Sequence, residues 1–139
     1  METIKGIQAG IIEDFEMFDD WVQKYEYLID LGKELTPIEE KYKIGDNLIK
    51  GCQSRVWLHA EKQDDIIIYT AESDAIMTKG IIAILINVLS NQKASEIISA
   101  DLSFIDAIGL KEQLSATRAN GLVSMIKKMK LYALVLNNK

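Results

Sequence analysis

The sequence predicts an α+β fold in which helices pack on one face of a small antiparallel sheet. Apolar residues recur at helical spacing near both ends of the chain, and a segment that ends at Leu89 is apolar on nearly all sides. Between these helical segments, residues 54–61 and 66–70 carry strand patterns separated by a polar turn. The 139 residues, 48% of them hydrophobic and only one of them proline, predict a single domain over residues 1–139.

The N-terminal part of the chain is predicted to be helical. Residues 4–31 carry apolar side chains at helical spacing, which favours one long helix or two helices with a bend between them. Gly10 and the pair Asp19 and Asp20 are the candidate break points. Gly32 follows the last periodic residue and suits the left-handed position after a helix end.

A short helical turn is expected before the cysteine. Thr36 would be its N-cap, Pro37 its first residue and Glu39 the partner in a capping box. Residues 43–47 then break the regularity and lead the chain to Cys52.

Residues 54–61 and 66–70 form the predicted antiparallel hairpin. The first segment alternates loosely between apolar and polar residues, and the second is β-branched and aromatic. The polar residues 62–65 have the length of a hairpin turn. Leu48 and Ile49 are candidates for a third strand. Because a two-stranded sheet is marginal by itself, the helices must cover one face of it.

A central helix is expected after the hairpin. Ser73 or Asp74 would cap it, and the helix would end at Leu89, before Ser90 and Asn91. Because this segment is apolar on nearly all sides, we expect it to be buried.

The remaining residues predict three further helices. Two short helices are expected at residues 94–99 and 101–108, with Gly109 as the stop. The last helix begins at residues 115–117, and its apolar face comprises Leu122, Ile126, Met129, Ala133 and Leu136.

The composition argues against nucleic acid and membrane partners. The net charge of −5 predicts repulsion from polyanions, and Lys127, Lys128 and Lys130 are better explained as a solvated helix face. The longest apolar run, residues 80–86, is far shorter than the roughly 20 residues of a membrane span. No signal peptide is indicated, so we expect a cytoplasmic protein whose thiol is kept reduced.

Cys52 is the only cysteine and the main candidate for chemistry. It cannot form an internal disulfide, and one cysteine with one histidine does not supply a zinc site, so we expect no metal and no cofactor. Gly51 permits an unusual backbone and the close approach of another molecule, and the cations of Lys50 and Arg55 favour the thiolate. A small buried hydrophobe is the alternative interpretation, and the pattern alone leaves both open.

His59, the only histidine, is not expected to assist Cys52. An extended chain rises about 3.3 Å per residue, which separates the two side chains by roughly 20 Å. A general base must instead lie within hydrogen-bond reach of its nucleophile. We therefore expect His59 to be a strand-face residue. A thiol without base, metal or cofactor suits the covalent carriage of a group better than turnover of a small molecule.

Four segments in a fixed order carry a family resemblance. They are residues 21–32, the segment Gly51-Cys-Gln-Ser-Arg-Val-Trp57, Ser73 and Asp74 with Lys79 and Gly80, and residues 114–122. With these segments, which extend over about residues 20–135, the chain resembles the SufE family of sulfur acceptor proteins and its Gly-Cys-Gln-Ser-x-Val-Trp signature. Lys93, Ala94 and Ala116 depart from the family's usual helix starts, which leaves the chemistry untouched.

The resemblance implies a SufE/IscU-like fold and a sulfur acceptor function. Such proteins accept sulfur from the persulfide of a pyridoxal-phosphate cysteine desulfurase, raise its turnover and pass the sulfur toward an iron–sulfur scaffold protein. The matching position makes Cys52 the persulfide carrier. The supporting or partner-contact residues that the resemblance implies are Gly51, Gln53, Ser54, Asp74 and Arg118.

Three functions remain to be distinguished. The first is a persulfide carrier that docks on a desulfurase, the second a regulatory desulfurase-binding module that carries no sulfur, and the third a thiol-dependent enzyme. A homodimer is compatible with the sequence. For a carrier, we expect Cys52 to be partly shielded in the free protein and exposed on docking, because shielding protects a persulfide from oxidation. A positive neighbour such as Arg118 would promote the thiolate.

Overall fold

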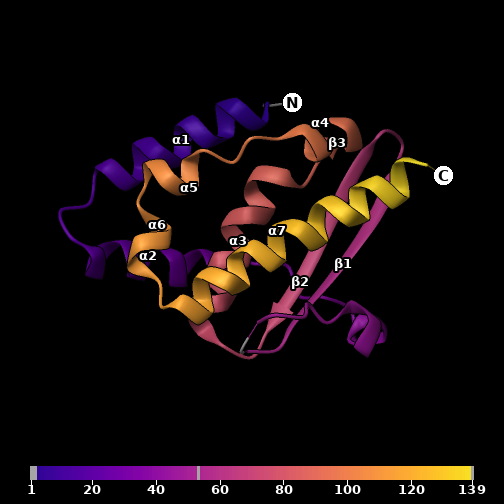
Figure 1. Cartoon of the computed structure of the whole chain (residues 1–139), viewed down its shortest axis with the longest axis horizontal. Coiled ribbons are helices and arrows are strands. Elements are labelled where there is room, and N and C mark those ends of the chain that lie inside the picture. Colours follow the sequence, from indigo (N-terminus) through magenta and orange to yellow (C-terminus); the bar gives the residue numbers. More distant parts are fainter. Residues whose placement is uncertain (1–2, 53, 139) are drawn as a thin grey trace.

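A computed structural model describes residues 3–52 and 54–138 of the chain. Its sheet has the antiparallel order β1-β2-β3, formed by β1 (Val56–Gln63), β2 (Ile66–Ser73) and β3 (Gln92–Lys93). Helices lie against one face of this sheet (Figure 1). The predicted α+β class, with helices on a small antiparallel sheet, is confirmed.

The N-terminal segment forms two helices, α1 (Ile4–Glu16) and α2 (Trp21–Lys33). The break lies at the predicted aspartate pair, because the side chain of Asp20 accepts a hydrogen bond from the Gln23 N–H at 3.0 Å and caps α2. Gly10 lies inside α1, so the alternative break at this glycine is wrong.

Gly32 packs against another helix instead of ending its own. It lies within α2, and a Cβ atom at this position would be 2.9 Å from the Gly80 nitrogen of α3 (Ile76–Leu89). Conversely, a Cβ atom on Gly80 would be 2.3 Å from the carbonyl oxygen of Leu28. The predicted capping role of Gly32 is therefore wrong, because the close crossing of α2 and α3 requires a glycine here.

The expected helical turn after Thr36 begins later in the chain. The short 3₁₀ helices are η1 (Glu40–Tyr42) and η2 (Gly45–Asn47), and Glu39 precedes η1 without a side-chain cap. The predicted capping box is thus wrong. Residues 36–39 form no helical turn, and Ile38 among them is buried in the core with 4% of its surface exposed. Burial of this side chain outweighs the local preference.

The hairpin is confirmed, with a tighter turn than the sequence predicts. Lys62 and Gln63 still pair with β2, so only Asp64 and Asp65 connect the strands, and Asp64 has a φ of 56°. Leu48 forms an isolated bridge with Trp57 and no further ladder, so the third strand predicted there is wrong. The third strand is β3, which pairs with the beginning of β2.

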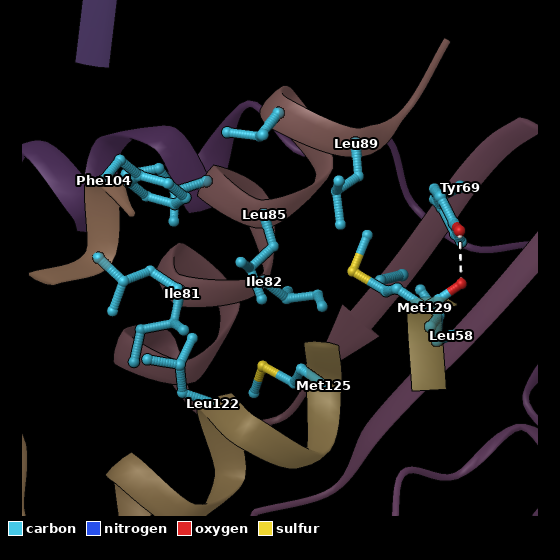
Figure 2. Close-up of a cluster of buried hydrophobic side chains, with 14 of the residues drawn as sticks. Leu58, Tyr69, Ile81, Ile82, Leu85, Leu89, Phe104, Leu122, Met125 and Met129 are labelled. Carbon is cyan, nitrogen blue, oxygen red and sulfur yellow. Dashed lines mark hydrogen bonds between the residues drawn. The ribbon is translucent and has the colours of Figure 1, made fainter. Parts of the chain in front are cut away.

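Helix α3 is the buried centre of the fold, as predicted. Its residues 80–85 are all buried, and Figure 2 shows Ile81, Ile82 and Leu85 facing side chains of α7 (Ala116–Asn137). The predicted cap is wrong, because Ser73 belongs to β2 and α3 follows Ala75 without a side-chain cap.

The C-terminal part contains α4 (Ala94–Ser99), α5 (Phe104–Ala107), α6 (Leu110–Gln113) and α7. Gly109 has a φ of 72° and ends α5, as predicted, but α6 begins directly after it. The expected helix at residues 101–108 therefore shrinks to α5, and α6 was not predicted. On α7, Leu122, Met129 and Ala133 of the predicted face are buried, whereas Ile126 and Leu136 are partly buried.

Hydrogen bonds of two tyrosine hydroxyls hold α7 against neighbouring elements. The Tyr69 hydroxyl of β2 donates to the Met129 carbonyl at 2.6 Å (Figure 2), and the Tyr132 hydroxyl contacts the Leu58 carbonyl at 3.2 Å. Tyr132 also donates to the Asn47 side-chain oxygen at 3.0 Å. The middle of α7 is thus held on the sheet, which positions its first turns.

We predict that Gly80→Ala destabilises the protein. The added methyl group overlaps the Leu28 carbonyl, and such overpacking costs about 1–3 kcal/mol. Urea unfolding followed by circular dichroism measures the change. Gly10→Ala is the control, because its added Cβ has no contact within 4 Å beyond its neighbours and the backbone of its own helix, and it should stabilise α1 by about 0.5–1 kcal/mol. Equal shifts in both variants would contradict the packing argument.

Candidate functional site

Cys52 lies in a loop that precedes β1 and rests against α7. Its thiol donates a long hydrogen bond to the Gly121 carbonyl oxygen, with the sulfur 3.7 Å away. The side chain is half-buried. Beside it is a cavity of about 60 Å³, lined by Cys52, Ser54, Thr78, Ile81, Thr117, Arg118, Gly121 and Met125. We call this space the thiol cavity.

Glycines on the loop and on α7 allow the loop to lie this close to the helix. Gly51 has a φ of 92°, and a Cβ atom on it would be 2.5 Å from the Ser124 hydroxyl oxygen. A Cβ atom on Gly121 would be 3.3 Å from the Cys52 sulfur. The unusual backbone expected at Gly51 is confirmed. The group that approaches Gly51 in this structure is the chain's own helix.

Burial raises the pKa of the Cys52 thiol above its usual value. The expectation that the cations of Lys50 and Arg55 favour the thiolate is wrong for the free protein, since burial is the only cause of the shift in the pKa of Cys52. Arg118 lines the thiol cavity, but its side chain is exposed to solvent. The partial shielding expected for Cys52 agrees with the structure, and its exposure on docking stays a prediction.

Asp74 anchors the end of the cysteine loop. Its carboxylate accepts a hydrogen bond from the Arg55 N–H at 3.1 Å, and its own N–H donates to the Arg55 carbonyl at 3.4 Å. Ser54, between Cys52 and this anchor, lines the thiol cavity. Of the residues predicted for the site, Gln53 lies outside the described part of the chain.

Residues 51, 52, 54, 74 and 118 thus lie at or beside one loop, and their roles in the site stay a prediction. Sequence reasoning missed the contributions of Gly121 and Ser124. Gly121 lies within a segment that resembles the family, and this was the only sign of its importance in the sequence. Its contact with Cys52 is seen only in the structure.

His59 has structural partners on the other face of β1. Its Nε2 atom is 3.0 Å from a Glu61 carboxylate oxygen, and its ring stacks on that of Tyr42 at 3.5 Å between centroids. The hydrogen bond from His59 lowers the pKa of Glu61. Val56 and Leu58, by contrast, point into the core. This agrees with the prediction that His59 is a strand-face residue and no base for Cys52.

Two structural features are absent from the part of the chain that the structure describes. The described residues contain no group of three or more His, Cys, Asp or Glu side chains arranged to hold a metal ion. Among them there is also no helix with the length and hydropathy needed to cross a membrane.

Comparisons with known proteins agree on one family. The family model described as "SufE: Fe-S metabolism associated domain" matches residues 9–133. An uncharacterised SufE-like protein of Rhizobium meliloti is 42% identical over 86% of this chain and 89% of its own. A SufE-like protein of Synechocystis is 37% identical over 95% of this chain and 83% of its own.

Two further comparisons extend this set. The Arabidopsis thaliana SufE-like protein 1, chloroplastic/mitochondrial, is 37% identical over 93% of this chain, which covers 35% of the plant protein. The solution structure of a hypothetical protein from Thermus thermophilus superposes with a TM-score of 0.81 at 14% identity, over 96% of this chain and 97% of that one. This last similarity shows the fold alone.

We predict that Cys52 reacts more slowly with iodoacetamide in the folded protein than in the urea-unfolded chain at pH 8. The thiolate is the attacking species, and a raised pKa reduces its fraction at that pH. The rate should therefore rise at a higher pH in the folded protein than in the unfolded chain. Mass spectrometry follows the reaction at this single cysteine. Equal rates in both states would refute the shielding.

We also predict that Asp74→Ala loosens the cysteine loop. Losing a hydrogen bond worth about 0.5–1.5 kcal/mol should speed alkylation of Cys52 roughly 2- to 10-fold, because the loop opens more often. Asp74→Asn is the matched control, since its amide oxygen can still accept from the Arg55 N–H. The anchor role fails if the alanine variant reacts like the wild type, or if asparagine behaves like alanine.

Proposed function

The chain belongs to the SufE family, and from this premise we propose that it accepts persulfide sulfur from a cysteine desulfurase onto Cys52. A role in iron–sulfur metabolism follows from the family itself. The observation that carries the finer proposal is the placement of the only cysteine, within the Gly51-Cys-Gln-Ser segment, beside a cavity bounded by Gly121.

The reaction is a thiol exchange. The Cys52 thiolate attacks the outer sulfur of the donor persulfide and forms a new S–S bond as the old one breaks. The donor cysteine leaves as a thiolate, and Cys52 becomes a persulfide, so sulfur and charge are conserved. No base, metal or cofactor of this chain is needed for that step.

The thiol cavity supports storage of the acquired sulfur. Its volume of about 60 Å³ exceeds the roughly 10–15 Å³ that one ordered water requires, so an additional sulfur atom fits beside Cys52. Enclosure there would limit oxidation of the persulfide.

Attack requires deprotonation, which burial disfavours. We propose that docking exposes the loop and that Arg118, at the cavity wall, stabilises the thiolate during transfer. Gly51, Gln53, Ser54 and Asp74 would support the loop or meet the partner.

The wider role follows the same proposal. The protein would stimulate the desulfurase and relay sulfur to an iron–sulfur scaffold protein. It would act in the cytoplasm as one domain, alone or as a homodimer. The alternative is a regulatory desulfurase-binding module that carries no sulfur.

We predict a one-sulfur mass increment after incubation with a cysteine desulfurase and free cysteine. The increment should be absent in Cys52→Ala, because that variant lacks the accepting sulfur. Intact mass spectrometry and desulfurase turnover are measured in the same mixtures. Stimulation that survives Cys52→Ala, without any increment on the wild type, would identify the regulatory module instead. Turnover of a small thioester by the protein alone would indicate an enzyme.

A further inference from the structure

A second hollow lies next to the thiol cavity, on the opposite side of Gly51. Its volume is about 530 Å³, and it runs between the segment before Cys52 and the outer side of α7. We call it the basic groove; its walls include Asp46, Leu48 and Lys50 on one side and Ser124, Lys127 and Lys128 on the other.

Adjacent residues of the cysteine loop and of α7 separate the basic groove from the thiol cavity. On the loop, Lys50 lines the groove and Cys52 lines the cavity, with Gly51 between them. On α7, Gly121 faces the cavity, whereas Ser124, one turn later, lines the groove and lies against Gly51. A segment bound in the groove therefore contacts the residues adjacent to the reactive thiol.

The charge of the groove is opposite to that of the whole chain. Lys50 and Lys127 are exposed, and neither forms an ion pair with any residue the structure describes. Lys128 donates to the backbone carbonyl of Asp46 at 3.4 Å, which leaves its charge without a carboxylate partner. The three lysines outnumber the single carboxylate of Asp46, in a chain whose net charge is −5.

The prediction that Lys127, Lys128 and Lys130 form one solvated helix face is wrong. Lys130 points away from the groove, because its ammonium donates to the Ala100 carbonyl at 2.7 Å. Lys127 and Lys128 both line the groove, where they meet Lys50 from the loop. The basic character is thus concentrated beside the cysteine loop.

We propose that the basic groove binds an acidic segment of the sulfur donor and thereby aligns that partner with the Cys52 loop; this rests on the function proposed above. Carboxylates of the segment would pair with Lys50 and Lys127, while Leu48 and Leu131 offer apolar contact along the groove. A long polyanion fits less well, since the acidic remainder of the surface repels it.

The test uses the full chain and a pyridoxal-phosphate cysteine desulfurase. Stopped-flow fluorescence measures the association rate of the wild type and of the double variant Lys50→Glu/Lys127→Glu. At ~10 mM salt, where the screening length is ~30 Å, the variant should associate at least about tenfold more slowly. At ~1 M salt, where that length is ~3 Å, the two rates should converge.

Two further variants sharpen the comparison. Lys5→Glu/Lys93→Glu changes the net charge by the same amount at exposed lysines of α1 and β3, toward the end of the molecule away from the beginning of α7 (Figure 1). It should retain most of the wild-type rate. The neutral variant Lys50→Gln/Lys127→Gln should show an intermediate rate, and far-UV circular dichroism confirms that each variant is folded.

Three results would overturn the proposal. The first is an unchanged association rate in Lys50→Glu/Lys127→Glu, and the second is an equal loss in the Lys5 and Lys93 control. The third is binding of a single-stranded oligonucleotide to the wild type but not to the groove variant, with the rate of desulfurase association unchanged. The one-sulfur increment on the wild type is scored separately, so failure of the carrier function and failure of the groove are distinguishable.

Discussion

The burial of α3, whose residues 80–85 are all buried, is the constraint on which the rest of the structure depends. A helix that is apolar all round cannot face water, so β2 and α7 cover it on one side and α1 and α2 on the other. Each fully buried Ile or Leu on it contributes about 1.5–3 kcal/mol. The same helix supplies Thr78 and Ile81 to the thiol cavity, so the site is built directly on the buried core.

Most of the fold could be predicted from local sequence patterns. Periodicity revealed α1, α2, α3 and α7, and β-branched composition revealed the hairpin, because these signals depend on neighbours in the chain. The failures lie where a distant contact overrides the local preference. Gly32 has the position of a helix end but packs against Gly80. The capping-box sequence around Ile38 forms no helical turn, because this side chain is buried in the core. The pairing of β3 with the start of β2 has no signature in two residues.

The residues of the candidate site could be predicted better than the pKa of its thiol. The isolated cysteine, Gly51 and the family segments identified the loop, and the distance argument removed His59. The raised pKa of the thiol was not predictable from the neighbouring charges, because charge along the chain is visible in a sequence and desolvation is not; only the shielding expected for a carrier pointed to it. The roles of Ser124 and Gly121 could not be predicted for a related reason. The importance of a small residue depends on which atoms pack against it, and the sequence does not show these contacts.

The two anchors of the cysteine loop limit how far the thiol can travel. The Ile49 N–H donates to the Val56 carbonyl at 2.8 Å, and the Arg55 N–H is held by Asp74. Cys52 is three residues from either Ile49 or Arg55, and even a straightened chain covers only about 10 Å over that span. The loop is therefore a short flap and not a swinging arm. In the proposed transfer, the donor's cysteine therefore has to be brought to within about that distance of the loop.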